Sequence, residues 1–318
     1  MADNNENQPN RSLKEITESI SLLVKQGKPM KFEEDLNYTL PPFVSKPQWT
    51  ELGDALRIAE KYSTGNVPGN KFISLRLDGH GFSKMVQRLR KAEAFCSGYS
   101  PDFGRIMQEC CVSLMDQFSC SFGYTQSDEI TVVIPATRVI RGEQQPHAFN
   151  GRVLKLCTLA ASTVATLFNY RVAELTELSP SLLARFDCRL GIYDTFEEAL
   201  SLVLWRAYDC GINGIADACH HQRGKIEGAK QAVGKSNREK LLFLHKHNLL
   251  PLADHQAYGS FYVRVKRVRE LEDPRTNEKV VRLRGVVEKV DGGVLNLFQE
   301  GKLILKDEVL EEDEEIKE

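Results

Sequence analysis

The chain is organised around the stretch Phe72-Ile73-Ser74-Leu75-Arg76-Leu77-Asp78-Gly79-His80-Gly81-Phe82. Its apolar first half predicts a buried strand, and its glycine-rich second half predicts a turn that begins at the carboxylate Asp78. Further along, Gln126-Ser127-Asp128-Glu129 stands between the apolar segments 122–125 and 130–134, which predicts a hairpin whose turn carries two more acids. The sequence therefore places carboxylates at two strand ends.

The predicted elements around these carboxylates follow the order strand, helix, strand, strand, helix, strand. The strands lie in 72–82, 122–125, 130–134 and 186–193, and apolar residues at helical spacing predict helices at 103–118 and 147–170. This order is the split β-α-β unit of ferredoxin-like domains, an α+β fold with two helices on one face of an antiparallel sheet. In that topology the first strand is a neighbour of the central hairpin. We therefore expect Asp78 to lie beside the turn 126–129.

Composition divides the chain into four parts. Residues 1–50 are Asn/Glu-rich and then interrupted by prolines, which predicts a mostly flexible extension outside the core with one short amphipathic helix at 13–24. Residues 51–255 are predicted to form the main domain, with additional helices at 49–62 and 195–220. Residues 256–306 are predicted to form a basic β-hairpin region of the same domain, with its turn at 273–277. Residues 307–318 are predicted to be a disordered acidic tail.

Charge and cysteine content narrow the classes of function. The tail holds eight acids and one lysine, so residues 1–306 carry a formal charge of +5 although the whole chain carries −2. A mildly basic body of this kind permits binding to nucleic acid. Eight cysteines without paired CxxC spacing, in a chain without a predicted signal peptide, indicate reduced thiols and a cytoplasmic location. The polar, acidic first residues disfavour a mitochondrial location. No apolar run reaches the roughly 20 residues of a membrane span, so we expect no membrane partner.

Asp78 and Asp128 together fit a site for two Mg²⁺ ions. Mg²⁺ is held in proteins by one or two carboxylates together with phosphate oxygens and water, and a pair of ions suits phosphoryl transfer. Gly79 can add its carbonyl oxygen, and the glycines after Asp78 allow backbone N–H groups to approach a triphosphate. Glu129 is a third candidate catalytic acid, although alternation along a strand turns it away from its neighbour. Taken singly, each acid is better explained as an ordinary turn residue.

Several blocks of the sequence resemble the tRNA(His) guanylyltransferase family over about residues 72–243. The blocks are Arg76-Leu77-Asp78-Gly79-His80-Gly81-Phe82, Gly123-Tyr124-Thr125-Gln126-Ser127-Asp128-Glu129, Phe186-Asp187-Cys188-Arg189, Trp205-Arg206-Ala207-Tyr208-Asp209-Cys210-Gly211-Ile212-Asn213 and Lys235-Ser236-Asn237. The resemblance implies a polymerase-like palm in residues 51–255 that adds nucleotides to the 5′ end of tRNA in the 3′-to-5′ direction. It also implies that ATP activates the 5′ phosphate and that GTP or other nucleoside triphosphates are the substrates for addition. The implied assembly is a homotetramer.

Carried onto this chain, the resemblance implies the following site. Asp78, the Gly79 carbonyl and Asp128 hold two Mg²⁺ ions, and Asp78, Asp128 and Glu129 are the catalytic acids. The implied nucleotide-binding residues are Asp78, Gly79, His80, Gly81, Phe82, Ser83, Ser127, Asp128, Lys155, Lys235 and Asn237. Lys155 and Lys235 are equally explained as solvated surface lysines.

The sequence departs from the family pattern at three places. His80 replaces the usual Arg, Ser83 replaces the usual His, and Gly211-Ile212-Asn213-Gly214 replaces His-Ile-Asn-Asn. These departures favour the divergent guanylyltransferase-like branch, which repairs truncated 5′ ends, over addition of a single 5′ G to tRNA(His). The same palm also fits a nucleotide cyclase or a catalytically silent tRNA-binding protein.

Two further groups of basic residues follow the main motifs. Arg264, Lys266 and Arg282 in the predicted basic hairpin are candidate RNA-binding residues, because Lys and Arg contact phosphates without reference to sequence. His220-His221 is predicted to lie on the surface, since adjacent residues on a helix point about 100° apart and make a poor metal pair.

Overall fold

The computed structural model describes residues 11–26, 30–31, 39–40, 46–59, 65–96, 98–272 and 279–290. The predicted acidic tail and the hairpin turn 273–277 lie outside the described residues.

A six-stranded antiparallel sheet forms the centre of the molecule, in the order β10-β9-β4-β5-β3-β8. Its strands are β3 (Phe72–Gly79), β4 (Phe122–Gln126), β5 (Glu129–Ile134), β8 (Phe186–Tyr193), β9 (Ser260–Glu272) and β10 (Lys279–Val290). The four strands β4-β5-β3-β8 have the ferredoxin-like order that the sequence predicts, so the predicted α+β fold class is confirmed. The C-terminal hairpin extends this sheet because β9 pairs with β4.

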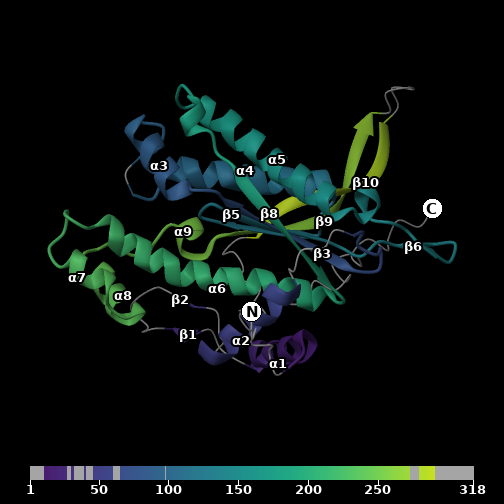
Figure 1. Cartoon of the computed structure of the whole chain (residues 1–318), viewed down its shortest axis with the longest axis horizontal. Helices are drawn as coiled ribbons and strands as arrows, with labels where there is room; N and C mark the ends of the chain where they lie inside the picture. The colour runs from purple at the N-terminus through teal and green to yellow at the C-terminus, as the bar shows by residue number, and fades with distance from the viewer. Residues whose placement is uncertain are drawn as a thin grey trace, which may run out of the picture.

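Helices on one face of the sheet enclose the larger apolar core. Figure 1 shows α4 (Pro101–Phe118) and α5 (Val153–Ala173) on this face, with α3 (Phe82–Lys91) at one end. The fully buried side chains of Leu75, Leu77, Leu114 and Phe168 belong to this core. Burial of such side chains contributes about 1.5–3 kcal/mol each, which explains why the apolar face of each helix is the one that contacts the sheet.

By length and composition, α5 is the one helix in the described part of the chain that could cross a membrane. Here it packs against α4 and β8, and its residues Leu156, Ala160, Val164 and Phe168 recur at helical spacing in the core. The core helix of a soluble protein has the same length and composition, so α5 is weak evidence for a membrane.

The other face of the sheet is covered by α6 (Phe196–His221), which Figure 1 shows running below the strands. The side chain of Thr195 accepts from the Glu198 N–H, and the Glu198 carboxylate accepts in return, so a capping box fixes where α6 begins. Helices α7 (Ala229–Val233), α8 (Asn237–Lys246) and α9 (Asp254–Tyr258) pack at its C-terminal end around a small apolar cluster.

Two expectations about element positions are wrong. The helix expected from residue 147 begins only at Val153, because Phe149 and Asn150 adopt left-handed backbone angles that interrupt a helix. The segment expected to lie outside the core contains α1 (Leu13–Gln26), which packs against α2 (Lys46–Ala59) and α6 and buries Ile16. Two short strand pairs complete the sheets: β1 (Met30–Lys31) pairs with β2 (Thr39–Leu40), and β6 (Val139–Ile140) pairs with β7 (Glu143–Gln144). The described residues also include two 3₁₀ helices, η1 (Ala148–Gly151) and η2 (Pro180–Leu182).

Candidate active site

The structure brings the end of β3 and the β4–β5 turn together. Asp78 pairs in register with Glu129, and the N–H of Gly79 donates to the carbonyl of Asp128 at 3.1 Å. Ser127 takes a left-handed backbone conformation, and its hydroxyl donates to the Asp128 carboxylate at 3.1 Å. The two carboxylate positions predicted from the sequence are therefore neighbours.

The electrostatics of Asp128 reflect this proximity. Partial burial raises the pKa of the Asp128 carboxyl above its usual value, and the negative charge of Asp78 raises it further. A divalent cation between two such carboxylates would favour their ionised forms.

The donor atoms suit Mg²⁺, although the described residues contain no group of three or more His, Cys, Asp or Glu side chains placed to hold a metal. Mg²⁺ does not require such a group, because one or two carboxylates and phosphate oxygens are its usual ligands. Asp78, Asp128 and the Gly79 carbonyl could supply oxygen ligands of this kind. Their role as metal ligands stays a prediction.

Glu129 is the first residue of β5, and its carboxylate contacts α6. Its carboxylate accepts from Arg206 Nε of α6 at 2.5 Å, and Arg76 Nη1 of β3 lies 3.6 Å away. Burial raises the pKa of Glu129, whereas the two arginines lower it. The predicted catalytic acid Glu129 is therefore held in an ion-pair network, and its part in catalysis stays a prediction.

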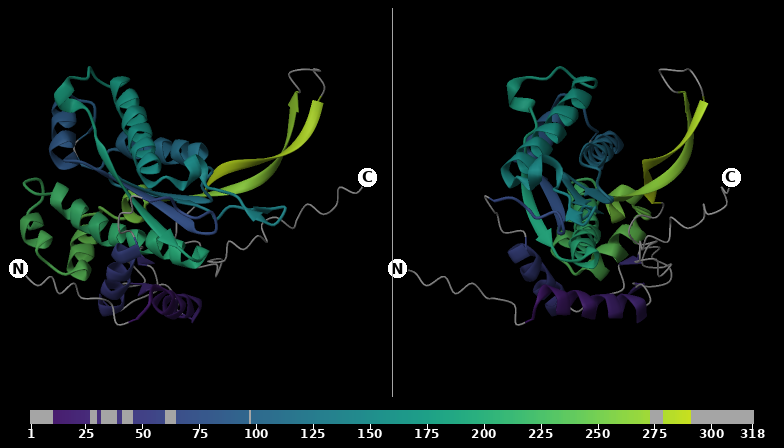
Figure 2. Two further views of the ribbon diagram at one scale, coloured as in Figure 1. Left: turned by 45° about the vertical axis from the view of Figure 1, so that its right-hand side comes forward. Right: turned by 90° about the vertical axis from the view of Figure 1, so that its right-hand side faces the viewer.

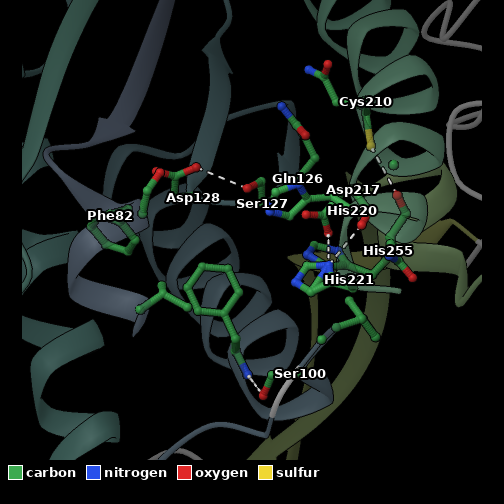
Figure 3. A pocket seen from close by; sticks show the side chains of 18 of the residues that line it. Phe82, Ser100, Gln126, Ser127, Asp128, Cys210, Asp217, His220, His221 and His255 are labelled. Atoms are coloured by element: carbon green, nitrogen blue, oxygen red, sulfur yellow. Dashed lines mark hydrogen bonds and ion pairs between the residues drawn. The ribbon is translucent and has the colours of Figure 1, made fainter. Parts of the chain in front are cut away.

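A cavity of about 340 Å³ opens beside Ser127 and Asp128 (Figure 3). Its lining comes from α3, the loop before α4, the β4–β5 turn, α6 and α9. Of the predicted nucleotide-binding residues, Phe82, Ser83, Ser127 and Asp128 line it. A volume of this size falls in the range of small-molecule sites.

The turn between β3 and α3 suits the approach of phosphate groups. Gly81 precedes α3 with a φ of 67°, a left-handed conformation that glycine adopts without strain, and no side chain caps the helix. The first N–H groups of a helix attract anions. A side chain at Gly79 would overlap the Phe82 ring, so this close turn requires glycine. The backbone N–H of His80 already donates to the carbonyl of Arg185, and the residue is exposed.

Three predicted basic or polar positions are not beside the cavity. Lys155 is at the start of α5, where the Val153 N–H donates to the Gly65 carbonyl, and this is the end of the sheet opposite Asp78. Lys155 instead lies over the Phe149 ring at 4.9 Å, and its contact with a nucleotide stays a prediction. Lys235 and Asn237 lie at the start of α8, where Lys235 is 3.7 Å from Glu239.

The candidate RNA-binding residues of the hairpin differ in their surroundings. Arg264 donates to the carbonyls of Met115 and Cys120 and to the Asp116 carboxylate, so it stabilises the C-terminal end of α4. Its contact with RNA stays a prediction. Lys266 is exposed. Arg282 pairs in register with Arg269, across the two strands.

Sequence reasoning missed one wall of the cavity. Asn213, Asp217 and His221 are spaced four residues apart along α6, and they line the cavity together with Arg90 of α3. His221 therefore does not lie on the outer surface as expected, although the spacing of four was visible in the sequence. One departure from the family pattern also has a local reason: a side chain at Gly214 would overlap the Gln256 carbonyl of α9.

Residues 54–194 match the model of the tRNAHis guanylyltransferase family, whose members are nucleotidyltransferases. The resemblance found in the sequence motifs is thereby confirmed.

Two kinds of relatives accompany this match. An uncharacterized protein of Acanthamoeba polyphaga mimivirus is 29% identical, and the match covers 62% of this chain and 70% of that protein. The tRNA(His) guanylyltransferase of Saccharomyces cerevisiae has a similar fold, with a TM-score of 0.53 and 16% identity over 71% of this chain and 95% of that one. A bacterial tRNA(His) guanylyltransferase-like protein in complex with GTP gives a TM-score of 0.53 with 20% identity, covering 80% and 96% of the two chains.

Proposed function

We propose that this protein is a Mg²⁺-dependent nucleotidyltransferase that adds nucleotides to the 5′ end of tRNA in the 3′-to-5′ direction, repairing truncated ends. The observation that carries the proposal is the position of the Asp78-Gly79 strand end beside Asp128, a residue that lines a cavity of about 340 Å³. The family of the matched region and the bacterial relative's complexes with ATP and GTP support it.

In this proposal each element of the site has a separate task. Asp78, Asp128 and the Gly79 carbonyl would hold Mg²⁺, and the bound ion would supply charge neutralisation at the phosphates and at the attacking hydroxyl. The N-terminus of α3, with Ser83, orients the triphosphate, and the cavity holds the nucleoside. Partial burial of Asp128 limits water at the reacting phosphate.

The test is extension of a 5′-truncated, 5′-labelled tRNA with ATP, Mg²⁺ and all four nucleoside triphosphates. We expect wild-type protein to lengthen the 5′ end and Asp78→Asn or Asp128→Asn to lower the rate at least about 100-fold, since loss of about 3 kcal/mol of charge stabilisation has that effect. Glu143→Gln, an exposed acid on β7, is the matched control and should keep the wild-type rate. Absence of extension by the wild type, or equal extension by the Asp variants, would contradict the proposal.

The description of the matched family favours a second candidate within the same chemistry, namely addition of a single 5′ G to tRNA(His). Extension of full-length tRNA(His) with GTP, and none of truncated tRNAs, would identify this activity. Binding of tRNA without turnover would instead favour a silent tRNA-binding protein, and a cyclic product from nucleoside triphosphate alone would favour a cyclase.

We also infer a homotetramer in the cytoplasm, on the basis of the family resemblance and the cysteine content. Light scattering coupled to size-exclusion chromatography measures the mass of the assembly, and therefore the number of subunits. A mass of about one chain would contradict it.

A further inference from the structure

Two cysteines from distant parts of the chain meet where α5 packs against β8. Cys157 lies on the face of α5 that belongs to the larger apolar core, next to Leu156. Cys188 alternates along β8 with Phe186 and Leu190, which are buried in the same core, so its side chain faces α5. The two thiols are hydrogen-bonded to each other. The fold therefore brings two nucleophilic groups together on neighbouring elements.

This hydrogen bond gives the two thiols different roles. It lowers the pKa of Cys157, and the same bond, together with burial, raises the pKa of Cys188, so Cys188 donates and the Cys157 sulfur accepts. Burial is the main cause that raises the pKa of Cys110 and of Cys210 to about 12. Because the thiolate is the reactive form of cysteine, Cys157 is the nucleophile of the pair.

The pair keeps some contact with solvent although it belongs to the core. β8 is an edge strand of the six-stranded sheet within the described part of the chain. Cys188 on this strand is half-buried, and 8% of Cys157 is exposed. The thiols of Cys110, Cys111 and Cys120 lie in the same core and are fully buried. A small oxidant therefore reaches the pair more easily than it reaches these three cysteines.

We propose that Cys157 and Cys188 form a reversible disulfide when the protein meets hydrogen peroxide. The Cys157 thiolate attacks one oxygen, the O–O bond breaks, and a sulfenic acid forms; the second oxygen leaves as hydroxide and takes up the proton that Cys157 released. The Cys188 sulfur then attacks the Cys157 sulfur, and the hydroxyl leaves with the Cys188 proton as water. Two thiols and one peroxide thus give one disulfide and two waters, and a dithiol reductant reverses the change by exchange.

The disulfide acts on the strand that carries Asp78. Cys188 pairs in register with Leu77, and the next pair along the two strands is Asp78 with Asp187. A disulfide brings two sulfurs closer than a hydrogen bond does, so its formation draws β8 toward α5 and moves the paired strand β3. Disulfides that require such movement are the labile, regulatory ones. The effect on activity rests on the proposed function, whereas the disulfide itself does not.

The first experiment maps the bond in the full chain. The protein is treated with hydrogen peroxide, the remaining thiols are alkylated, and the linked peptides are identified by mass spectrometry. We expect one pair of peptides joined through Cys157 and Cys188, which a dithiol reductant separates. Cys157→Ser and Cys188→Ser should each abolish this link. Cys96→Ser is the matched control, because it removes an exposed cysteine and should keep the link.

The second experiment measures nucleotide addition to a 5′-truncated tRNA before oxidation, after oxidation and after reduction. Oxidation should lower the rate of the wild type and of Cys96→Ser at least about 10-fold, since a displacement of about 1 Å in a site can cost about 100-fold in rate. The reductant should restore the rate. Cys157→Ser and Cys188→Ser should keep their own rates after the same treatment.

The outcomes separate this inference from the proposed function. Absence of a link between Cys157 and Cys188 in oxidised wild type would overturn the disulfide. A link that forms without changing the rate would overturn its effect on Asp78. Absence of nucleotide addition by the reduced wild type would overturn the proposed function and the effect on activity, while the peptide map still decides the disulfide. The map uses unaltered protein, so it remains decisive if a variant does not fold.

Discussion

At the scale of single residues, two adjacent acids have different environments. Asp128 belongs to the β4–β5 turn beside the end of β3, whereas Glu129 is the first residue of β5 and contacts Arg206 of α6. Asp128 lines the cavity, whereas the Glu129 carboxylate is buried between two arginines. We therefore expect loss of the Asp128 charge to act mainly on catalysis and loss of the Glu129 charge to act mainly on stability.

His255 provides a residue-scale test of burial. The ring is almost fully buried, its Nδ1 is 3.0 Å from the Ser260 hydroxyl, and burial lowers its pKa to about 4. An unfolded chain binds the proton near pH 6.5, so below this value the unfolded state holds one more proton and stability falls as the pH falls. From pH 6.5 to pH 5 the loss is about 2 kcal/mol.

Urea unfolding at pH 7 and at pH 5 measures how much the free energy of unfolding falls between these pH values. In His255→Gln this fall should be smaller by about 2 kcal/mol. Gln256→Ala, at a neighbouring position without a titratable group, should keep the wild-type difference. An unchanged difference in His255→Gln would mean that the ring is not held neutral.

At the scale of elements, Arg206 joins α6 to the sheet. It contacts Glu129 of β5 at 2.5 Å and Asp209 at 3.1 Å, while its guanidinium lies 4.9 Å from the centre of the Trp205 ring. Only 12% of the Arg206 side chain and 6% of the Glu129 side chain are exposed, so water does little to compensate for a lost partner.

Arg206→Ala should therefore lower the free energy of unfolding by about 3–5 kcal/mol, as removal of one partner from a buried ion pair does. Arg206→Met with Glu129→Leu should cost clearly less than the two single changes added together, because the double variant leaves neither buried charge alone. Urea unfolding of the wild type, the two single variants and the double variant gives this coupling. Additive losses would show that the two side chains do not interact.

The elements differ in how far the sequence predicts them. Strands β3, β4, β5 and β8 follow from apolar runs that end in turn residues, and the pairing of Asp78 with the turn follows from the strand order alone. The start of α5 is missed because the pattern of apolar residues does not reveal the left-handed backbone angles of Phe149 and Asn150. The cavity wall that Asp217 and His221 of α6 form with Arg90 of α3 is missed because contacts between distant segments are set by packing.

At the scale of the whole molecule, the cavity and the hairpin lie at opposite ends of the sheet. Ser260 of β9 pairs with Thr125 near the cavity, and the strand then runs away from it, so that Lys266 is roughly 20 Å further along. Both views in Figure 2 show the hairpin of β9 and β10 projecting from the body. If the proposed function holds, RNA that contacts Lys266 would lie roughly 20 Å from the cavity.

Salt dependence tests this whole-molecule arrangement. Lys266→Ser should weaken binding of full-length tRNA and lower the slope of log affinity against log salt by about one, the effect of losing one phosphate contact. Fluorescence anisotropy over a series of salt concentrations provides the slope. Lys14→Ser removes an exposed lysine from α1 and should leave the slope unchanged. Identical slopes for wild type and Lys266→Ser would exclude Lys266 from the RNA interface.

The most direct test of the central claim is a crystal structure with Mn²⁺ in place of Mg²⁺ and a non-hydrolysable GTP analogue. Anomalous scattering from Mn²⁺ locates the ions without reference to the protein. We predict metal positions within about 2.1 Å of carboxylate oxygens from both Asp78 and Asp128, with the triphosphate at the start of α3. Ions that contact neither carboxylate, or a triphosphate bound elsewhere on the protein, would contradict the account.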